Sequence, residues 1–135
     1  VFVDSKRRER NGTFSPDGRW VAYQSDTSGR DEIIVRPFPS KDPAHTISRD
    51  GGMHPRWRGD GQELFFLSPD GTMMAARIDR TNGSATGVEP LFPTMLRGSA
   101  NRPYVVDKRG ERFLLPIAVD PPLRVVLDWR ALLER

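Results

Sequence analysis

The chain has 135 residues, of which 36% are hydrophobic and 29% are charged, a balance typical of one ordinary globular domain. Its twelve glycines and twelve prolines exclude a mainly helical protein, because proline removes a backbone donor and glycine costs conformational entropy. The absence of cysteine excludes disulfides and thiolate metal sites.

Charge and hydropathy exclude two kinds of partner. No apolar run approaches the roughly eighteen residues that a membrane span needs. The net charge of +3 gives only a weak field, and the basic stretch at residues 6–10 lacks the aromatic neighbours on which nucleic-acid bases stack. We therefore expect neither membrane insertion nor nucleic acid as a partner.

One segment recurs along the chain at nearly equal intervals. It reads TFSPDGRWVAYQSD at residues 13–26, RWRGDGQELFFLSPDG at 56–71 and, more loosely, YVVDKRGERFLLPI at 104–117. Asp17 and Asp60 are 43 residues apart, and Arg109 follows at the same place 49 residues later. Repeats of about 40 to 50 residues indicate propeller blades or solenoid units.

The repeated segment begins with a tight turn. Pro16 presets φ for the first corner of a type I turn, Asp17 tolerates the second corner, and Gly18 can adopt a positive φ at the exit. The proline is lost in the later copies, but Gly61 and Gly110 remain. We therefore predict the same hairpin with a glycine bulge in all three copies.

Strands are expected on both sides of each turn. Continuous apolar runs follow the turns at 20–23, 64–67 and 113–115, which is typical of strands covered on both faces. Third strands are expected at 32–38 and 72–79, short outer strands at 45–48 and 88–92, and a last strand within 122–129. A sandwich is the alternative all-β fold, and the 43-residue repeat favours the propeller.

These elements predict an all-β fold of about three four-stranded antiparallel blades of a β-propeller. The blades are expected at about 10–50, 51–95 and 101–129, followed by a short helical turn at 128–135 capped by Asp128. Three blades do not close a ring, because known propellers have four to eight. We expect a partial ring or one completed by a homodimer, with six blades favoured, and residues 1–4 (VFVD) could add the missing outer strand.

Binding residues are expected on the innermost strands, just ahead of each turn. The polar residues at this place in the innermost strands are Asn11, Thr13, His54, Arg56 and Arg102. Solvated channel lining without a ligand is the alternative interpretation of these residues. The aromatic residues of the strands are expected in the core instead, namely Trp20, Trp57, Phe65 and Phe66.

The sequence offers little for catalysis, metals or cofactors. Only His45 and His54 could serve as a catalytic base, and neither lies in a known motif, so we expect no enzyme, no zinc site and no cofactor. Asp26, Ser28 and Asp31 could offer oxygen ligands to calcium. A plain connection between strands is the preferred interpretation of that segment.

The segments FSPDGRWVAYQSD and EIIVRPF resemble the WD40-like, TolB-type β-propeller repeat of bacterial proteins. The ending YVVDKRGERFLLPI with LRVVLDW is similar to the last blade of propellers attached to bacterial serine/threonine kinases. The resemblance implies a non-catalytic interaction or sensing module, extracytoplasmic, with a protein, peptide or small ligand at its funnel. The alternatives are the gating propeller of a prolyl-oligopeptidase-like serine peptidase and an array that assembles only with itself.

Overall fold

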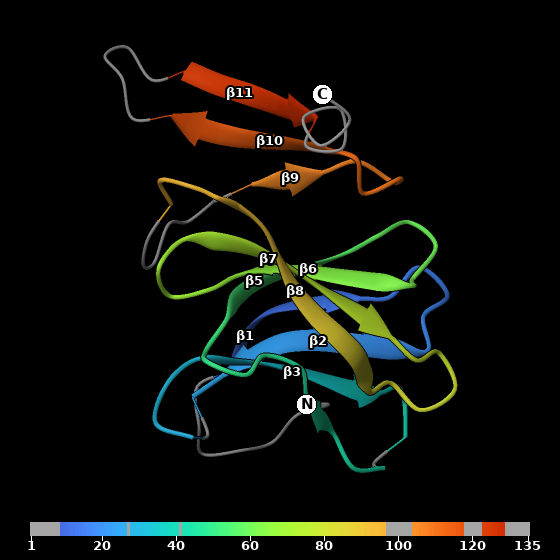
Figure 1. Ribbon diagram of the computed structural model, residues 1–135. Helices are drawn as coiled ribbons and strands as arrows, with labels where there is room; N and C mark the ends of the chain where they lie inside the picture. The colour runs from blue at the N-terminus through green and yellow to red at the C-terminus, as the bar shows by residue number, and fades with distance from the viewer. Residues whose placement is uncertain (1–8, 27, 41, 97–103, 118–122, 129–135) are drawn as a thin grey trace.

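The computed structural model describes residues 9–26, 28–40, 42–96, 104–117 and 123–128. Over these ranges the chain forms eleven strands in three antiparallel sheets, one after another in sequence (Figure 1). The first sheet has the order β1-β2-β3-β4, with β1 at Glu9–Phe14, β2 at Trp20–Ser25, β3 at Glu32–Pro37 and β4 at His45–Thr46. The second has the order β5-β6-β7-β8, with β5 at Met53–Trp57, β6 at Glu63–Leu67, β7 at Thr72–Ile78 and β8 at Ala85–Pro93.

The third sheet has three strands in the described part of the chain. Its order is β11-β10-β9, with β9 at Val105–Val106, β10 at Arg112–Ile117 and β11 at Leu123–Asp128. The all-β prediction is confirmed. Asp128 is the last residue of β11, while the rest of the predicted helical turn and the segment VFVD lie outside the described residues. No helix in the described ranges is long and apolar enough to cross a membrane.

The predicted glycine turn is present in all three sheets. Gly18, Gly61 and Gly110 have φ of 73°, 72° and 69°. In each turn the glycine amide donates to the carbonyl three residues earlier, at 2.9 to 3.0 Å: Gly18 to Ser15, Gly61 to Arg58 and Gly110 to Asp107. The shared geometry explains why glycine persists where the other turn residues change.

In the third turn, one side chain accepts the two backbone hydrogen bonds that two side chains accept in the first turn. In the first turn, Asp17 and the Ser15 hydroxyl accept hydrogen bonds from the next two backbone amides after the glycine, at 3.0 and 3.1 Å. In the third, the carboxylate of Asp107 stands at the position of Ser15 and accepts from both corresponding amides, at 2.9 and 3.2 Å. An aspartate two positions earlier in the turn therefore compensates for Arg109.

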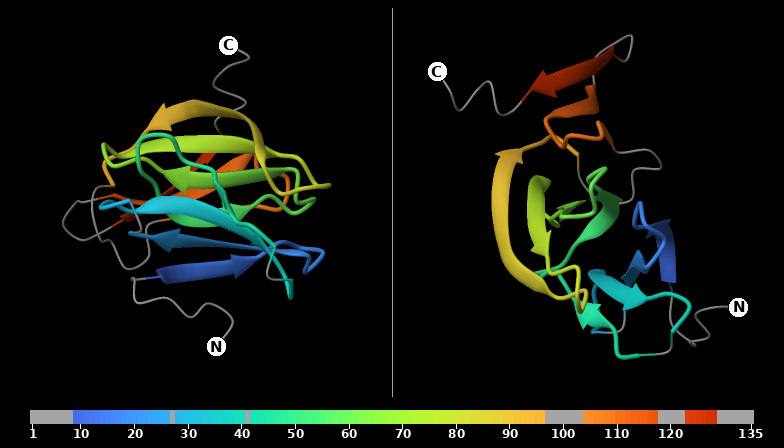
Figure 2. Two further views of the ribbon diagram at one scale, coloured as in Figure 1. Left: turned by 90° about the horizontal axis from the view of Figure 1, so that it is seen from below. Right: turned by 90° about the vertical axis from the view of Figure 1, so that its right-hand side faces the viewer.

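Two hydrophobic clusters hold the sheets together. One lies between the first and second sheets and the other between the second and third, so the second sheet is covered on both faces. The right-hand view of Figure 2 shows the three sheets in succession. The four aromatic residues expected in the core are buried there: Trp20, Trp57, Phe65 and Phe66.

Two expectations about the strands were wrong. In the third sheet only Phe113 of the run 113–115 is fully buried, because just one face of this sheet packs against the second. The outer strand β8 is nine residues long rather than short. It is long because Val88 packs against the first hydrophobic cluster while Leu91 and Phe92 pack against the second.

Candidate functional site

Both complete sheets carry a bulge in the innermost strand. The pairing of β1 with β2 shifts between Arg10 and Thr13, and the pairing of β5 with β6 shifts between Met53 and Arg56. Inside these bulges Asn11 and His54 have φ of 56° and 57°, a conformation that residues other than glycine rarely adopt. A bulge turns a side chain away from the alternation of a regular strand, and bulges are common beside functional sites.

The two bulges meet at one buried amide. Asn11 Nδ2 donates to Gln24 Oε1, and the backbone amide of His54 donates to the same oxygen at 2.8 Å. Asn11 Nδ2 also lies 3.3 Å from His54 Nδ1. Gln24 is buried on β2. A single side chain therefore fixes two residues that stand at the same place in successive repeats.

Charged and aromatic groups surround this pair. The guanidinium of Arg10 contacts both oxygens of Asp31, at 3.0 and 2.7 Å, and Gln24 Nε2 lies 3.4 Å from the same carboxylate. Arg56 stands over the ring of Tyr104, 5.9 Å from its centroid. The hydroxyl of Tyr104 donates to the His54 carbonyl at 2.6 Å, which connects the third sheet to the cluster.

The imidazole of His54 is neutral near pH 7. Burial lowers its pKa, and the positive charges of Arg56 and Arg10 lower it further, while Asp31 opposes the shift. A neutral ring with an unprotonated Nδ1 can accept the hydrogen bond of the Asn11 amide. We call the following residues the inner-strand cluster: Arg10, Asn11, Gln24, Asp31, His54 and Arg56.

The structure brings some of the predicted site residues together. Asn11, His54 and Arg56 lie in the inner-strand cluster. Thr13 contributes its backbone carbonyl, which accepts a hydrogen bond from Trp57 Nε1 at 3.1 Å. Arg102 lies outside the described residues.

Sequence reasoning missed other members of this region. Gln24 was not singled out, although a lone amide at the end of the apolar run of β2 was a visible signal. Asp31, considered above as a calcium ligand, forms an ion pair with Arg10. Within the described ranges, no group of three or more His, Asp or Glu residues is placed to hold a metal ion.

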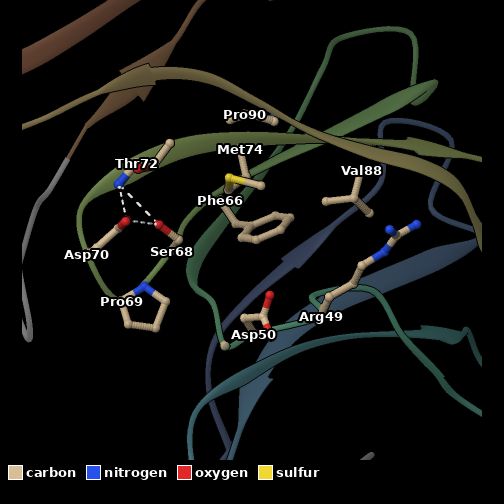
Figure 3. Close-up of a pocket in the computed structure, with 11 residues that line it drawn as sticks. Arg49, Asp50, Phe66, Ser68, Pro69, Asp70, Thr72, Met74, Val88 and Pro90 are labelled. Atoms are coloured by element: carbon tan, nitrogen blue, oxygen red, sulfur yellow. Dashed lines mark hydrogen bonds between the residues drawn. The ribbon is translucent and has the colours of Figure 1, made fainter.

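A separate pocket of about 440 Å³ lies outside the inner-strand cluster (Figure 3). Its walls come from the connection between the first and second sheets, from the turn between β6 and β7, and from β7 and β8. The lining residues include Arg49, Asp50, Phe66, Asp70, Met74 and Val88. The sequence could not show this pocket, because its walls are far apart in the chain.

Successive antiparallel sheets, packed face to face and each containing the same turn between two of its strands, define a β-propeller. No family model and no curated protein sequence matches the chain. Among solved structures, it is similar to an oligogalacturonate lyase from Vibrio parahaemolyticus, with a TM-score of 0.72 and 9% identity over 96% of this chain and 40% of that one. It is also similar to TolB from Acinetobacter baumannii, with a TM-score of 0.63 and 16% identity over 95% of this chain and 31% of that one.

Both neighbours are β-propellers, so the likeness establishes the fold. At these identities it establishes nothing about activity. The chain spans less than half the length of either neighbour.

Proposed function

We propose that this chain is a non-catalytic β-propeller interaction module that binds a protein or peptide through its inner-strand cluster. The observation that carries the proposal is the pair of left-handed residues, Asn11 and His54, fixed by one buried Gln24 amide. Such backbone conformations cost about 1–3 kcal/mol each, persist where the surrounding structure holds them, and cluster at functional sites. This chain adopts the costly conformation at two equivalent positions of the repeat.

The chemistry of the cluster favours binding over catalysis. A histidine acting as a base needs a nucleophile within reach of its ring, but His54 Nδ1 contacts the amide of Asn11, which is not a nucleophile. Half-buried Arg56 instead offers donors of the kind that orient a polar ligand, and exposed Asn11 keeps its side-chain carbonyl as an acceptor. With His54 neutral, Arg10 and Arg56 outweigh Asp31 by one positive charge, which favours an acidic peptide.

The resemblance of the chain's ending to kinase-attached propellers supports a wider form of this proposal. In that form the module is tethered to a signalling enzyme and reports the bound peptide to it. A homodimer that completes the ring would place a second cluster in the same channel. Both extensions depend on the binding proposed here.

A titration followed by NMR tests the binding. Short peptides of matched length, one rich in Asp and Glu, one rich in Lys and one neutral, are added to the isotope-labelled chain. We expect the acidic peptide to shift the side-chain amide signals of Asn11 and Gln24. Arg56→Gln should weaken this binding several-fold, as expected for loss of a partly exposed charge contact.

Arg80→Gln is the matched control, because Arg80 is exposed in the turn after β7 and the variant loses the same charge. It should leave the affinity unchanged. If all three peptides fail to shift the Asn11 and Gln24 signals, or if Arg80→Gln weakens binding as much as Arg56→Gln, the proposal is wrong.

A further inference from the structure

The innermost strands of the first two sheets are joined by a short series of polar hydrogen bonds. β1 and β5 lie side by side, and Asn11 of β1 meets His54 of β5 both directly and through Gln24. Gln24 and His54 are buried, so water cannot readily replace a hydrogen bond that is lost between them. The contact therefore depends on which group donates and which accepts.

The orientation of the Gln24 side-chain amide is fixed from two sides. The backbone amide of His54 can only donate, and it lies 2.8 Å from Gln24 Oε1. The carboxylate of Asp31 can only accept, and it lies 3.4 Å from Gln24 Nε2. Arg10 holds both oxygens of that carboxylate, at 3.0 and 2.7 Å. The Gln24 oxygen therefore faces the two bulges.

This oxygen in turn sets the tautomer of His54. Gln24 Oε1 can only accept, so Asn11 must face it with its side-chain nitrogen as the donor. The other hydrogen of the same NH₂ group is then available to His54 Nδ1, which lies 3.3 Å away. His54 therefore accepts at Nδ1 and carries its ring proton on Nε2.

A proton on His54 Nδ1 is incompatible with this arrangement. The ring would then present a donor to the donor of Asn11. The Asn11 amide could not turn over to accept it without placing its own oxygen against Gln24 Oε1. Protonation therefore breaks the direct contact between the two bulges, whichever side chain moves.

The groups around the ring decide when a proton is taken up. Within the described part of the chain, the charged or titratable groups that face His54 are Arg10, Asp31, Arg56 and Tyr104. Burial lowers the pKa of His54 most, and the two arginines lower it further, while Asp31 opposes the shift. Burial raises the pKa of Tyr104, so its hydroxyl stays protonated. Proton uptake by His54 is therefore expected below the ordinary histidine pKa of about 6.5.

We propose that His54 makes the junction between β1 and β5 a switch that responds to acid. Uptake of a solvent proton at Nδ1 breaks the hydrogen bond from Asn11, and the two left-handed bulges lose their direct contact. The second sheet differs, because Leu67 stands at the position that Gln24 has relative to the turn glycine. The switch is a property of the chain without ligand, so its failure would leave the peptide-binding proposal untouched.

An NMR titration of the isotope-labelled chain from about pH 7.5 to about pH 4.5 tests the switch. The ring nitrogens of His54 report its protonation, and the side-chain amides of Asn11 and Gln24 report the hydrogen bonds. We expect Nδ1 to be the unprotonated nitrogen at the upper pH. All three residues should then change together, with one midpoint below about pH 6.5. A ring that takes up its proton while both amides stay unchanged, or that takes up none in this range, would overturn the proposal.

Two variants preserve the backbone of the bulges. His54→Asn removes the titrating ring but tolerates a positive φ, so the Gln24 signals should no longer change with pH. Asn11→Gly also tolerates a positive φ and removes the donor to Nδ1, so the midpoint of His54 should rise toward about pH 6.5.

His45→Asn is the matched control, because it removes a histidine from the outer strand β4. It should leave the pH response of Gln24 intact. A Gln24 response that persists in His54→Asn or disappears in His45→Asn would contradict the proposal, as would an unchanged midpoint in Asn11→Gly.

Discussion

The second and third sheets share one turn but differ in what covers them. Gly61 and Gly110 have nearly the same φ and donate the same hydrogen bond. Yet every residue of the run 64–67 in β6 is buried, whereas Val105 and Val126 of the third sheet are 55% and 62% exposed. The turn is therefore set by local sequence, while burial is set by neighbouring sheets.

The two most exposed valines of the third sheet, Val105 and Val126, lie in one row with Leu114. Leu114 pairs with Val105 on one side and with Val126 on the other, so all three point to the same face of the sheet. The adjacent row contains Phe113, which is 0% exposed against the second sheet. One strand thus separates a covered face from an apolar face that the described residues leave open.

We expect the largest effect in β10, where alanine substitutions at neighbouring positions should differ most in the free energy of unfolding that they remove. Phe113→Ala should lower the free energy of unfolding by about 3–5 kcal/mol, because its ring packs edge-on against Phe65 and Phe92 at 5.1 and 5.3 Å. Leu114→Ala should cost about 1 kcal/mol, since its side chain is only half-buried. Urea unfolding of both variants measures the difference.

The second sheet provides the control for this contrast. Leu64→Ala and Phe65→Ala, on opposite faces of β6, should both cost at least about 2 kcal/mol, because both side chains are fully buried. If Leu114→Ala destabilises the chain as much as Phe113→Ala, the outer face of the third sheet is covered in solution and the comparison fails.

The next-largest loss of stability is expected to differ between two glycines that have nearly the same φ but different surroundings. A Cβ at Gly110 would lie 2.7 Å from the Phe65 ring and 2.9 Å from Arg58 Cδ, whereas Gly18 has no atom within 4 Å of a Cβ. Gly18→Ala should cost about 1–2 kcal/mol for backbone strain. Gly110→Ala should add about 1–3 kcal/mol for crowding.

Thermal or urea unfolding of the two glycine variants tests this difference directly. Equal losses of stability would mean that the third turn moves away from the second sheet to accommodate the methyl group. In that case the contact between these sheets is softer than the geometry implies.

Much of this architecture follows from local sequence. The glycine spacing fixed the hairpins, and the apolar runs located β2, β6 and β10, because turn chemistry and strand patterning act over a few residues. The third turn was harder to interpret, since the role of the missing aspartate passes to Asp107 earlier in the motif. The length of β8 was missed because it depends on two clusters formed by other sheets.

The sites were only partly visible in the sequence. Asn11 and His54 could be named because both are polar residues of the innermost strand just ahead of a turn. Their left-handed backbone and their shared contact with Gln24 required the sheets to be assembled. The pocket at Asp50 and Asp70 was invisible for the same reason, since no local pattern joins its walls.

A smaller effect concerns the hydrogen bond between the second and third sheets. Tyr104→Phe keeps the ring but leaves the His54 carbonyl without its donor from the buried hydroxyl. We expect a loss of about 1–3 kcal/mol, the usual cost of an unsatisfied buried group. Urea unfolding measures the loss, and the NMR signals of Asn11 report whether the cluster rearranges.

Tyr23→Phe is the matched control for this variant. Tyr23 is also buried, but its hydroxyl lies at a longer 3.4 Å from Arg36 Nε, so its removal should cost less. Equal losses from the two variants would show that the hydrogen bond to His54 has no special role in joining the sheets.

The smallest expected effect is the dependence of the free energy of unfolding on pH. It comes from carboxylates in the glycine turn that each sheet repeats. A hydrogen bond from Ser15 lowers the pKa of Asp17, and a hydrogen bond from Arg58 lowers that of Asp60. Because each folded pKa lies below the ordinary value of about 3.9, the unfolded chain takes up more protons as the pH falls. The stability from these carboxylates is therefore complete above about pH 4 and is lost as the pH falls through their folded pKa values.

Urea midpoints measured between about pH 5 and about pH 3 test this sign. Asp17→Asn and Asp60→Asn should each be less stable than the wild type at the upper pH and should approach it at the lower one. Both carboxylates are exposed, so the differences should be the smallest of the set. Asp42→Asn, matched in charge but outside the turns, should keep the wild-type slope; a flattened slope there would assign the effect to net charge rather than to the turns.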